Sequence, residues 1–177
     1  YLTHGFWAMS KEEELPCPGI SAVMLKSMED VTERVLEGVT KETSNDERAE
    51  IVTANIERIK EEAEANSDYQ VVIKSFYHGN KYYMIYNEVF KDVRMVGAPP
   101  SNIGKFGGDT DNWVWPRHTG DFSVFRIYVS PDGKAADYSE DNVPYTPNYH
   151  CPISLKGANE GDFTFVFGYP ARTNEYL

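Results

Sequence analysis

The side chains best suited to chemistry are gathered in one stretch, from Gly107 to Phe122. It reads GGDTDNWVWPRHTGDF and sets acidic, amide, indole, guanidinium and imidazole groups among glycines and a proline. A segment of this composition is expected to be a loop, and loops held by rigid strands are where binding and catalytic groups concentrate. Indole rings in such a loop build either a small local core or a recognition surface. Composition alone supports a functional site and a structural cluster equally well.

Metal and phosphate chemistry fit the sequence poorly. Asp109 and Asp111 have the spacing of calcium ligands, but an EF-hand loop also needs further oxygen ligands, a glycine at its sixth position and a terminal glutamate. Gly104–Gly108 lacks the lysine with serine or threonine that closes a phosphate-binding loop. His150 and Cys151 are direct neighbours and lack the usual gap between paired zinc ligands. We therefore expect no metal and no cofactor.

Asp121 is the most pointed candidate for catalysis. It follows Gly120 and heads an alternating run, Asp121–Val129, that predicts a strand. Chymotrypsin-like proteases present their triad aspartate in a similar way, as a buried carboxylate that accepts the Nδ1 proton of the catalytic histidine. The start of a strand would hold such an acid rigidly. The structural alternative is an aspartate that caps a turn at the end of a strand.

The elements around this stretch are expected to be mainly β. Runs rich in aromatic and β-branched residues predict strands at Ile20–Leu25, Tyr69–His78, Lys81–Asn87, Val89–Val96, Asp121–Val129 and Phe163–Phe167. Gly79-Asn80 is expected to form a two-residue hairpin turn, Gly97–Gly108 a loop and Pro131–Gly133 a turn. Many short strands at hairpin spacing are typical of an antiparallel barrel or sandwich.

Residues 28–68 differ in composition and contain no proline. Apolar residues recur there at helical spacing in two sets, first Val31, Val35, Leu36 and Val39, then Val52, Ile56, Ile59 and Ala63. Ser44 and Glu47 have the spacing of a capping box, which satisfies free amides at a helix start. The segment therefore predicts a helical hairpin of about 35 residues with a solvated charged face.

Composition bounds the class of protein. The 177 residues are enough for one core, and 41% hydrophobic and 14% aromatic residues suit a globular domain. The net charge of −11 argues against nucleic acid as a partner. No apolar run approaches the roughly 20 residues that span a bilayer. Cys17 and Cys151 are expected to be two free thiols, with one disulfide as the alternative.

Three strings of the sequence carry a resemblance to a known family. GFWAMSKEEELPCPG, GGDTDNWVWPRHTGDFSVFRIYV and FVFGYPARTNEYL together resemble serine peptidase family 46, the bacterial dipeptidyl-peptidases 7 and 11 and their relatives. The likeness covers the chain from Tyr1 to Leu177. It implies a chymotrypsin-like double β-barrel, to which residues 1–27 and 69–177 would contribute and into which residues 28–68 would be a helical insertion. It also implies a serine-type aminopeptidase that releases dipeptides from the N-terminus of oligopeptides.

The resemblance assigns roles to three residues. Asp121, in Gly-Asp-Phe-Ser, inherits the role of the triad aspartate, and Asn112 and Trp113 inherit the grip on the substrate's terminal ammonium and first residues. The family's histidine lies in a His-His-Cys-Gly type motif and its serine in a Gly-Asn-Ser-Gly type motif, and neither motif occurs here. The sequence, which opens at Tyr1 without a signal peptide, is therefore expected to be a piece that is inactive alone.

The same resemblance implies a periplasmic, cell-surface or secreted protein and leaves a homodimer open for the full-length chain. Two interpretations from other classes stay open. One is a non-catalytic peptide- or sugar-binding domain with Trp113 and Trp115 as an aromatic platform. The other is a calcium-stabilised adhesin module that uses Asp109 and Asp111.

Overall fold

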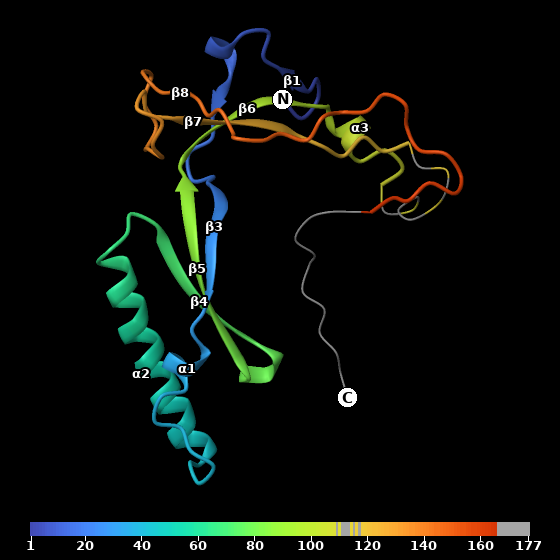
Figure 1. Cartoon of the computed structure of the whole chain (residues 1–177). Coiled ribbons are helices and arrows are strands. Elements are labelled where there is room, and N and C mark those ends of the chain that lie inside the picture. Colours follow the sequence, from blue (N-terminus) through green and yellow to red (C-terminus); the bar gives the residue numbers. More distant parts are fainter. Residues whose placement is uncertain (109, 111–113, 115, 117, 166–177) are drawn as a thin grey trace. The chain divides into compact units, whose positions relative to one another are not determined.

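The computed structural model describes residues 1–108, 110, 114, 116 and 118–165, and it divides the chain into two units, Tyr1–Tyr145 and Thr146–Leu177. The first unit is mostly β, with two antiparallel sheets and few helices (Figure 1). This confirms the prediction of a mainly β fold with a helical insertion. In the described residues no helix is both long and apolar enough to span a bilayer.

The larger sheet has five strands and is curled like half a barrel. Its strands are β1 (Phe6–Trp7), β2 (Leu15–Pro16), β6 (Asp92–Ala98), β7 (Val124–Val129) and β8 (Val143–Pro144). β6 is central: β1 and β2 pair with one of its edges, β7 pairs with the other, and β8 pairs with β7. Trp7, Gly97 and Val124 are cross-strand partners in one row. The register thus places the N-terminal strand and the strand that follows the candidate site on opposite edges of β6, in the same row of residues.

The smaller sheet has the order β3-β5-β4, with β3 at Ala22–Asp30, β4 at Gln70–Phe76 and β5 at Lys81–Phe90. Only Lys91 separates β5 from β6, so consecutive strands of the chain belong to the two sheets (Figure 1). The rings of Phe90 and Tyr145 lie 5.0 Å apart and add a contact where the two sheets meet. Phe90 is fully buried.

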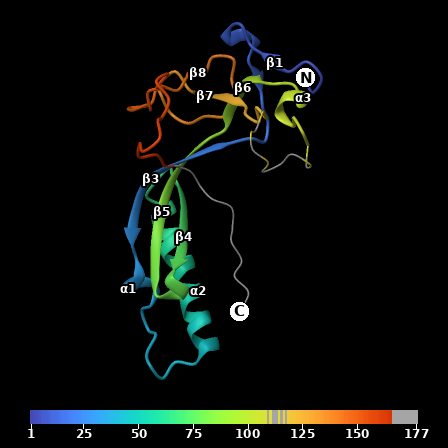
Figure 2. The same cartoon turned by 90° about the vertical axis from the view of Figure 1, so that its right-hand side faces the viewer.

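Two helices cover one face of the smaller sheet, α1 (Thr32–Val35) and α2 (Asn45–Glu64). In Figure 2 the helix α2 lies behind the three strands, which stand in front of it. The core between helices and sheet consists of the buried side chains Val31, Val35, Ile59, Val71, Tyr82 and Met84. Burial of this apolar surface is the main force that holds the insertion on its sheet.

The start of α2 is fixed by the predicted capping box. The Ser44 hydroxyl accepts a hydrogen bond from the Glu47 backbone N–H at 3.3 Å, and the Glu47 carboxylate accepts one from the Ser44 N–H at 3.0 Å. Both amides would otherwise lack partners at the helix start. The capping box predicted from Ser44 and Glu47 is therefore confirmed.

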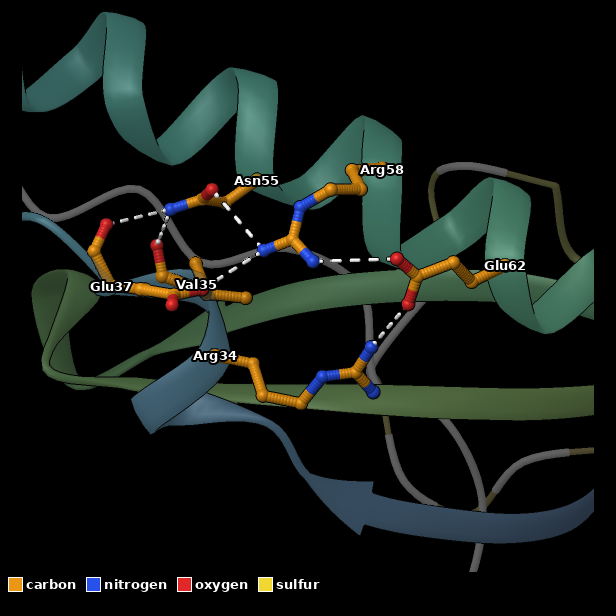
Figure 3. A network of polar contacts seen from close by, with 6 residues as sticks. All are labelled: Arg34, Val35, Glu37, Asn55, Arg58 and Glu62. Atoms are coloured by element: carbon orange, nitrogen blue, oxygen red, sulfur yellow. Dashed lines mark hydrogen bonds and ion pairs between the residues drawn. The ribbon is translucent and has the colours of Figure 1, made fainter.

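Polar side chains of α2 hold the segment that follows α1 (Figure 3). Asn55 donates from its amide to the backbone carbonyls of Val35, at 3.0 Å, and Glu37, at 2.9 Å. These carbonyls lie at the end of α1, where helical partners run out. Arg34 and Glu62 add an exposed ion pair of 2.7 Å, which contributes little by itself. The amide is therefore the more important of the two connections.

The predicted helical hairpin is right for its second helix and too long for its first. β3 continues through Met28 and Asp30, which pair with Ile85 and Tyr83. Cross-strand pairing satisfies the backbone there, so α1 is left with four residues. Tertiary pairing has outweighed the helical spacing of the apolar residues.

The predicted two-residue turn at Gly79-Asn80 is wrong. A 3-10 turn, η2 (Tyr77–Gly79), joins β4 to β5, and Tyr77 and His78 both have positive φ, 51° and 56°. The Asn80 amide donates to the Tyr77 carbonyl at 2.8 Å and stabilises this turn. A wider turn lets Phe76 pair with Lys81, which fixes the register of the hairpin.

Three further boundaries differ from expectation. A short helix, α3 (Ser101–Gly104), lies within the predicted loop Gly97–Gly108, and β7 begins at Val124 rather than at Asp121. Phe163–Phe165 is not a strand, and residues 166 and 167 lie outside the described part. A strand needs a partner for its backbone groups, and residues 146–165 contain no strand that could pair with it. A short 3-10 helix near the N-terminus, η1 (Lys11–Glu13), was not predicted from the sequence.

Replacing Ile59 by alanine tests the core of the insertion. Ile59 is fully buried among the residues of the smaller sheet and α1. We expect Ile59→Ala to lower the free energy of unfolding by about 2–5 kcal/mol, since the cavity is not refilled, and Ile59→Val by about 0.5–1.5 kcal/mol. Urea unfolding followed by circular dichroism measures both. Equal stability of Ile59→Ala and wild type would show that the helix does not pack as described.

Candidate active site

The segment before Asp121 is fastened to the α3 turn. The Gly120 N–H donates to the Ile103 carbonyl at 3.0 Å, and the Thr119 hydroxyl donates to the Phe106 carbonyl at 2.9 Å. Ile103 lies within α3, which begins directly after Pro100. These two bonds fix the chain immediately ahead of the candidate acid.

The segment after Asp121 is fastened to the N-terminal strand. The Phe122 ring lies 6.1 Å from the Trp7 ring, between centroids, at an angle of 49°. Two residues later Val124 pairs with Gly97 and begins β7. Asp121 is therefore the residue between two held neighbours, Gly120 and Phe122.

Asp121 is exposed, which corrects the expectation that its carboxylate is buried. It also lies three residues before β7 and not at the strand's first position. The neighbouring apolar side chains are exposed too, with Phe122 at 52% and Val124 at 41%. No element of the described chain covers the start of β7, so a carboxylate there faces solvent.

The predicted substrate-binding residues lie outside the described part of the chain. These are Asn112 and Trp113, together with Asp109, Asp111 and Trp115 of the alternative interpretations. Of the neighbouring side chains, His118 is described, and its ring lies 6.1 Å from the Phe106 ring in an edge-on arrangement. The structure therefore brings together the supports of Asp121, and the roles of Asn112 and Trp113 stay predictions.

A buried ion pair on β6 contacts a neighbouring strand of the sheet that carries the candidate site. Arg94 of β6 donates to Asp92 through Nε at 3.0 Å and Nη2 at 2.8 Å. Its guanidinium carbon lies 3.7 Å from the centre of the Tyr128 ring on β7, a cation–π contact. The Asn142 amide donates to the second oxygen of Asp92 at 2.9 Å. Both charges are thus paired and also hydrogen-bonded to neutral groups.

Glu14 forms a second buried polar contact in the same sheet. Its carboxylate accepts hydrogen bonds from Arg126 Nε at 2.8 Å and from the Tyr128 hydroxyl at 2.9 Å. It lies beside the short strand β2, so the contact ties the N-terminal segment to β7. The sequence analysis missed both clusters. Side chains at i and i+2 of a strand share a face, which could have linked Asp92 to Arg94, but no local pattern announces Glu14 or Asn142.

The protonation of these groups follows from their surroundings. Burial by itself would raise the pKa of Asp92, but the hydrogen bonds from Arg94 and Asn142 and the charge of Arg94 outweigh it and lower the pKa. Burial, followed by the hydrogen bond to Glu14, raises the pKa of Tyr128. Asp92 is therefore charged and Tyr128 neutral at pH 7.

Two cavities of the Tyr1–Tyr145 unit lie away from the candidate acid. One of about 770 Å³ lies beside the α2–β4 connection, and Asp68, Tyr69 and Lys91 contribute to its wall. Another of about 420 Å³ is bordered by the buried polar cluster, including Arg94 and Tyr128. Asp121 lines neither cavity. The candidate acid lies on a supported but open surface of this unit.

Cys17 and Cys151 are free cysteines, and Cys151 is exposed. The structure contains no cluster of three or more metal-binding side chains among the described residues. The chemistry available at the described site is that of a carboxylate held in place next to an aromatic pair.

Comparison with known proteins defines the class. The family model described as Peptidase S46 matches residues 1–177, and the chain belongs to this peptidase family. The resemblance found in the sequence is thereby confirmed over the whole chain. The matched region includes both sheets and the segment around Asp121.

Particular relatives are dipeptidyl-peptidases. The chain is 52% identical to an Asp/Glu-specific dipeptidyl-peptidase of Capnocytophaga gingivalis and 45% identical to dipeptidyl-peptidase 7 of the same organism. Each match covers 100% of this chain and 25% of the relative. The crystal structure of Porphyromonas endodontalis DPP11 in complex with the dipeptide Arg-Glu matches with a TM-score of 0.75 and 44% identity, over 92% of this chain and 25% of that one. The chain thus spans about a quarter of the length of these relatives.

The buried ion pair yields a prediction about stability. Asp92→Asn leaves Arg94 as a buried charge without its carboxylate, and we expect a loss of about 3–5 kcal/mol in the free energy of unfolding at pH 7. Lys91→Ala removes the exposed pair with Asp137 and should cost less than about 1 kcal/mol. Urea unfolding of the two variants measures the difference.

The same pair sets a pH dependence. Because the folded-state pKa of Asp92 is lowered, its contribution is present above the ordinary pKa of about 3.9 and is lost as the pH falls through the lower folded-state value. Below about pH 4 the stability gap between wild type and Asp92→Asn should therefore narrow. A gap that stays constant down to pH 2 would contradict this account of the pair.

Proposed function

We propose that this chain is the aspartate-bearing part of a serine-type dipeptidyl-peptidase that releases dipeptides from the N-terminus of oligopeptides. One observation carries the proposal: the Peptidase S46 model matches every residue from 1 to 177. The names of the relatives give the activity its class, since both Asp/Glu-specific and type 7 dipeptidyl-peptidases occur among them. In the full-length protein the two sheets would contribute to a chymotrypsin-like double barrel.

Asp121 would act as the acid of a Ser-His-Asp triad. Its carboxylate would accept the Nδ1 proton of a histidine from another part of the full-length protein, fix the tautomer and stabilise the imidazolium. That histidine would deprotonate a serine, which attacks the scissile carbonyl to give an acyl-enzyme carrying the dipeptide, and water would hydrolyse it. An exposed carboxylate with both neighbours held is suited to a partner that comes from outside this chain.

Asn112 and Trp113 would set the dipeptide register. An amide oxygen accepts a hydrogen bond from the substrate's terminal ammonium, and an indole ring forms a wall for the first residues. Holding the ammonium at a fixed distance from the serine makes the enzyme cut after two residues. The substrate is therefore an oligopeptide with a free amino terminus.

The preference for the substrate's second side chain is a separate question. The two Capnocytophaga gingivalis relatives differ in name, Asp/Glu-specific against type 7, and this chain is more similar to the first, at 52% against 45%. An acidic side chain is accordingly the first to test. The chain spans only a quarter of these relatives, so residues elsewhere can decide the preference. We also propose that the full-length protein is periplasmic, cell-surface or secreted, and that it can form a homodimer.

Replacing the candidate acid tests the proposal most simply. In the full-length protein, Asp121→Asn should lower kcat about 10⁴-fold, because the amide cannot hold the histidine in the required tautomer. Asp68→Asn, an exposed aspartate between α2 and β4, serves as the matched control and should keep normal turnover. Hydrolysis of a dipeptidyl-coumarin measures both. A loss of less than about tenfold in Asp121→Asn would remove the residue from the triad.

Substrate binding by Asn112 has its own signature. Asn112→Ala in the full-length protein should raise KM about tenfold or more, as expected for the loss of a hydrogen bond to a charged group, with a smaller loss in kcat. Asn148→Ala, at an exposed position, is the control. Steady-state kinetics on the same substrate separate the two constants. Unchanged kinetics of Asn112→Ala would show that this binding role is misassigned.

A further inference from the structure

The Trp7 ring of β1 lies directly against the backbone of β6 at Gly97. A Cβ atom built on Gly97 would lie 2.3 Å from Trp7 Cε3 and 2.5 Å from Cζ3. Real Cβ atoms do not come this close to a ring, so any larger residue at this position must move Trp7. Gly97 is not among the glycines with positive φ. It is therefore needed for space and not for backbone conformation.

The same ring also packs near Phe122, with the two ring centroids 6.1 Å apart and tilted by 49°. The indole is thus close both to the β6 backbone at Gly97 and to the residue that directly follows Asp121. Val124, the partner of Gly97 in β7, continues the same row of residues. Trp7 is therefore the side chain through which a change at Gly97 can reach Phe122.

Asp121 has a second fixed neighbour on its other side. Gly120 donates to the Ile103 carbonyl at 3.0 Å, and a Cβ on Gly120 would lie 3.0 Å from Ile103 Cγ2. One neighbour is held by a backbone hydrogen bond and the other by a ring contact. The ring contact is the restraint that a side-chain substitution can release.

Trp7 contributes little to the core of the chain. It is 53% exposed and does not belong to the buried cluster of the insertion. Half exposure is common for tryptophan, so its specific contacts and not its burial single out Trp7. Its described ring contact is with Phe122, next to the candidate acid.

We propose that Trp7, seated on Gly97 and packed against Phe122, is a positioning residue that holds Asp121 in its catalytic orientation. The inference rests on the proposed role of Asp121 as the triad acid. A displacement of about 1 Å in a catalytic group can cost about 100-fold in rate. A shift of Trp7 that moves Phe122 would therefore reduce turnover without removing any reacting group.

The test uses the full-length protein and a matched pair of glycine variants. Gly97→Ala introduces the Cβ that meets the Trp7 ring, whereas Gly104→Ala introduces one with no heavy atom within 4 Å. We expect Gly97→Ala to lower kcat about 100-fold with a smaller change in KM, and Gly104→Ala to leave both unchanged. Because a displaced carboxylate stabilises the imidazolium less, the acid limb of the kcat/KM profile should also move to lower pH in Gly97→Ala.

Variants at Trp7 show whether the effect passes through the ring. Trp7→Ala should lose kcat and shift the pH profile in the same direction, and Trp7→Phe should recover part of both. In the double variant Gly97→Ala/Trp7→Ala the methyl group no longer meets a ring, so the loss should equal that of Trp7→Ala alone. Losses that multiply in the double variant would overturn the proposal, since they would show that Gly97 acts independently of Trp7.

The Asp121→Asn variant, measured in the same assay, separates the triad role of Asp121 from the positioning role of Trp7. A loss of less than about tenfold there overturns the triad role and the positioning role together. A full loss there, with normal kcat and a normal pH profile in Gly97→Ala and Trp7→Ala, overturns the positioning role alone. If Gly97→Ala does not fold, the comparison of Trp7→Phe with Trp7→Ala still decides, because neither variant introduces a clash.

Discussion

The absence of a side chain at Gly97 allows the Trp7 ring of β1 to lie against the backbone of β6. Without a Cβ at that position the Trp7 ring can lie on the β6 backbone and still reach Phe122. Phe122 in turn borders Asp121, whose other neighbour is bonded to the Ile103 carbonyl. By our proposal, this close approach between two strands sets the placement of the candidate acid.

Asp121 lies next to a sheet held by buried polar contacts, and its own surface is exposed to solvent. In the larger sheet Arg94 and Asp92 form a buried ion pair, and Glu14 accepts two hydrogen bonds from β7. The exposed surface is at the start of β7, which no described element of the chain covers. A triad acid needs both properties: it must not move, and it must be reachable by an imidazole. The two requirements explain why an exposed carboxylate is compatible with the proposed role.

The capping box was predictable from the sequence, whereas the long-range contacts at the site were not. Ser44 and Glu47 are three residues apart and satisfy each other, so the start of α2 could be predicted from spacing alone. Trp7 and Gly97 are far apart in the chain, and no periodicity reveals that one needs the other to be a glycine. The expected burial of Asp121 was wrong because burial depends on which elements cover a strand, and that is a property of the whole assembly. The fold class and the family were predictable; the supports of the site were not.

A crystal structure of the full-length protein with a bound dipeptide tests the central claim most directly. The account predicts that the Asp121 carboxylate accepts a hydrogen bond from the Nδ1 of a histidine outside this chain, at about 2.6–3.2 Å, with that imidazole also within reach of a serine hydroxyl. It also predicts that Trp7 remains on Gly97 and against Phe122. A structure in which Asp121 faces solvent, while a different carboxylate meets the catalytic imidazole, would contradict it.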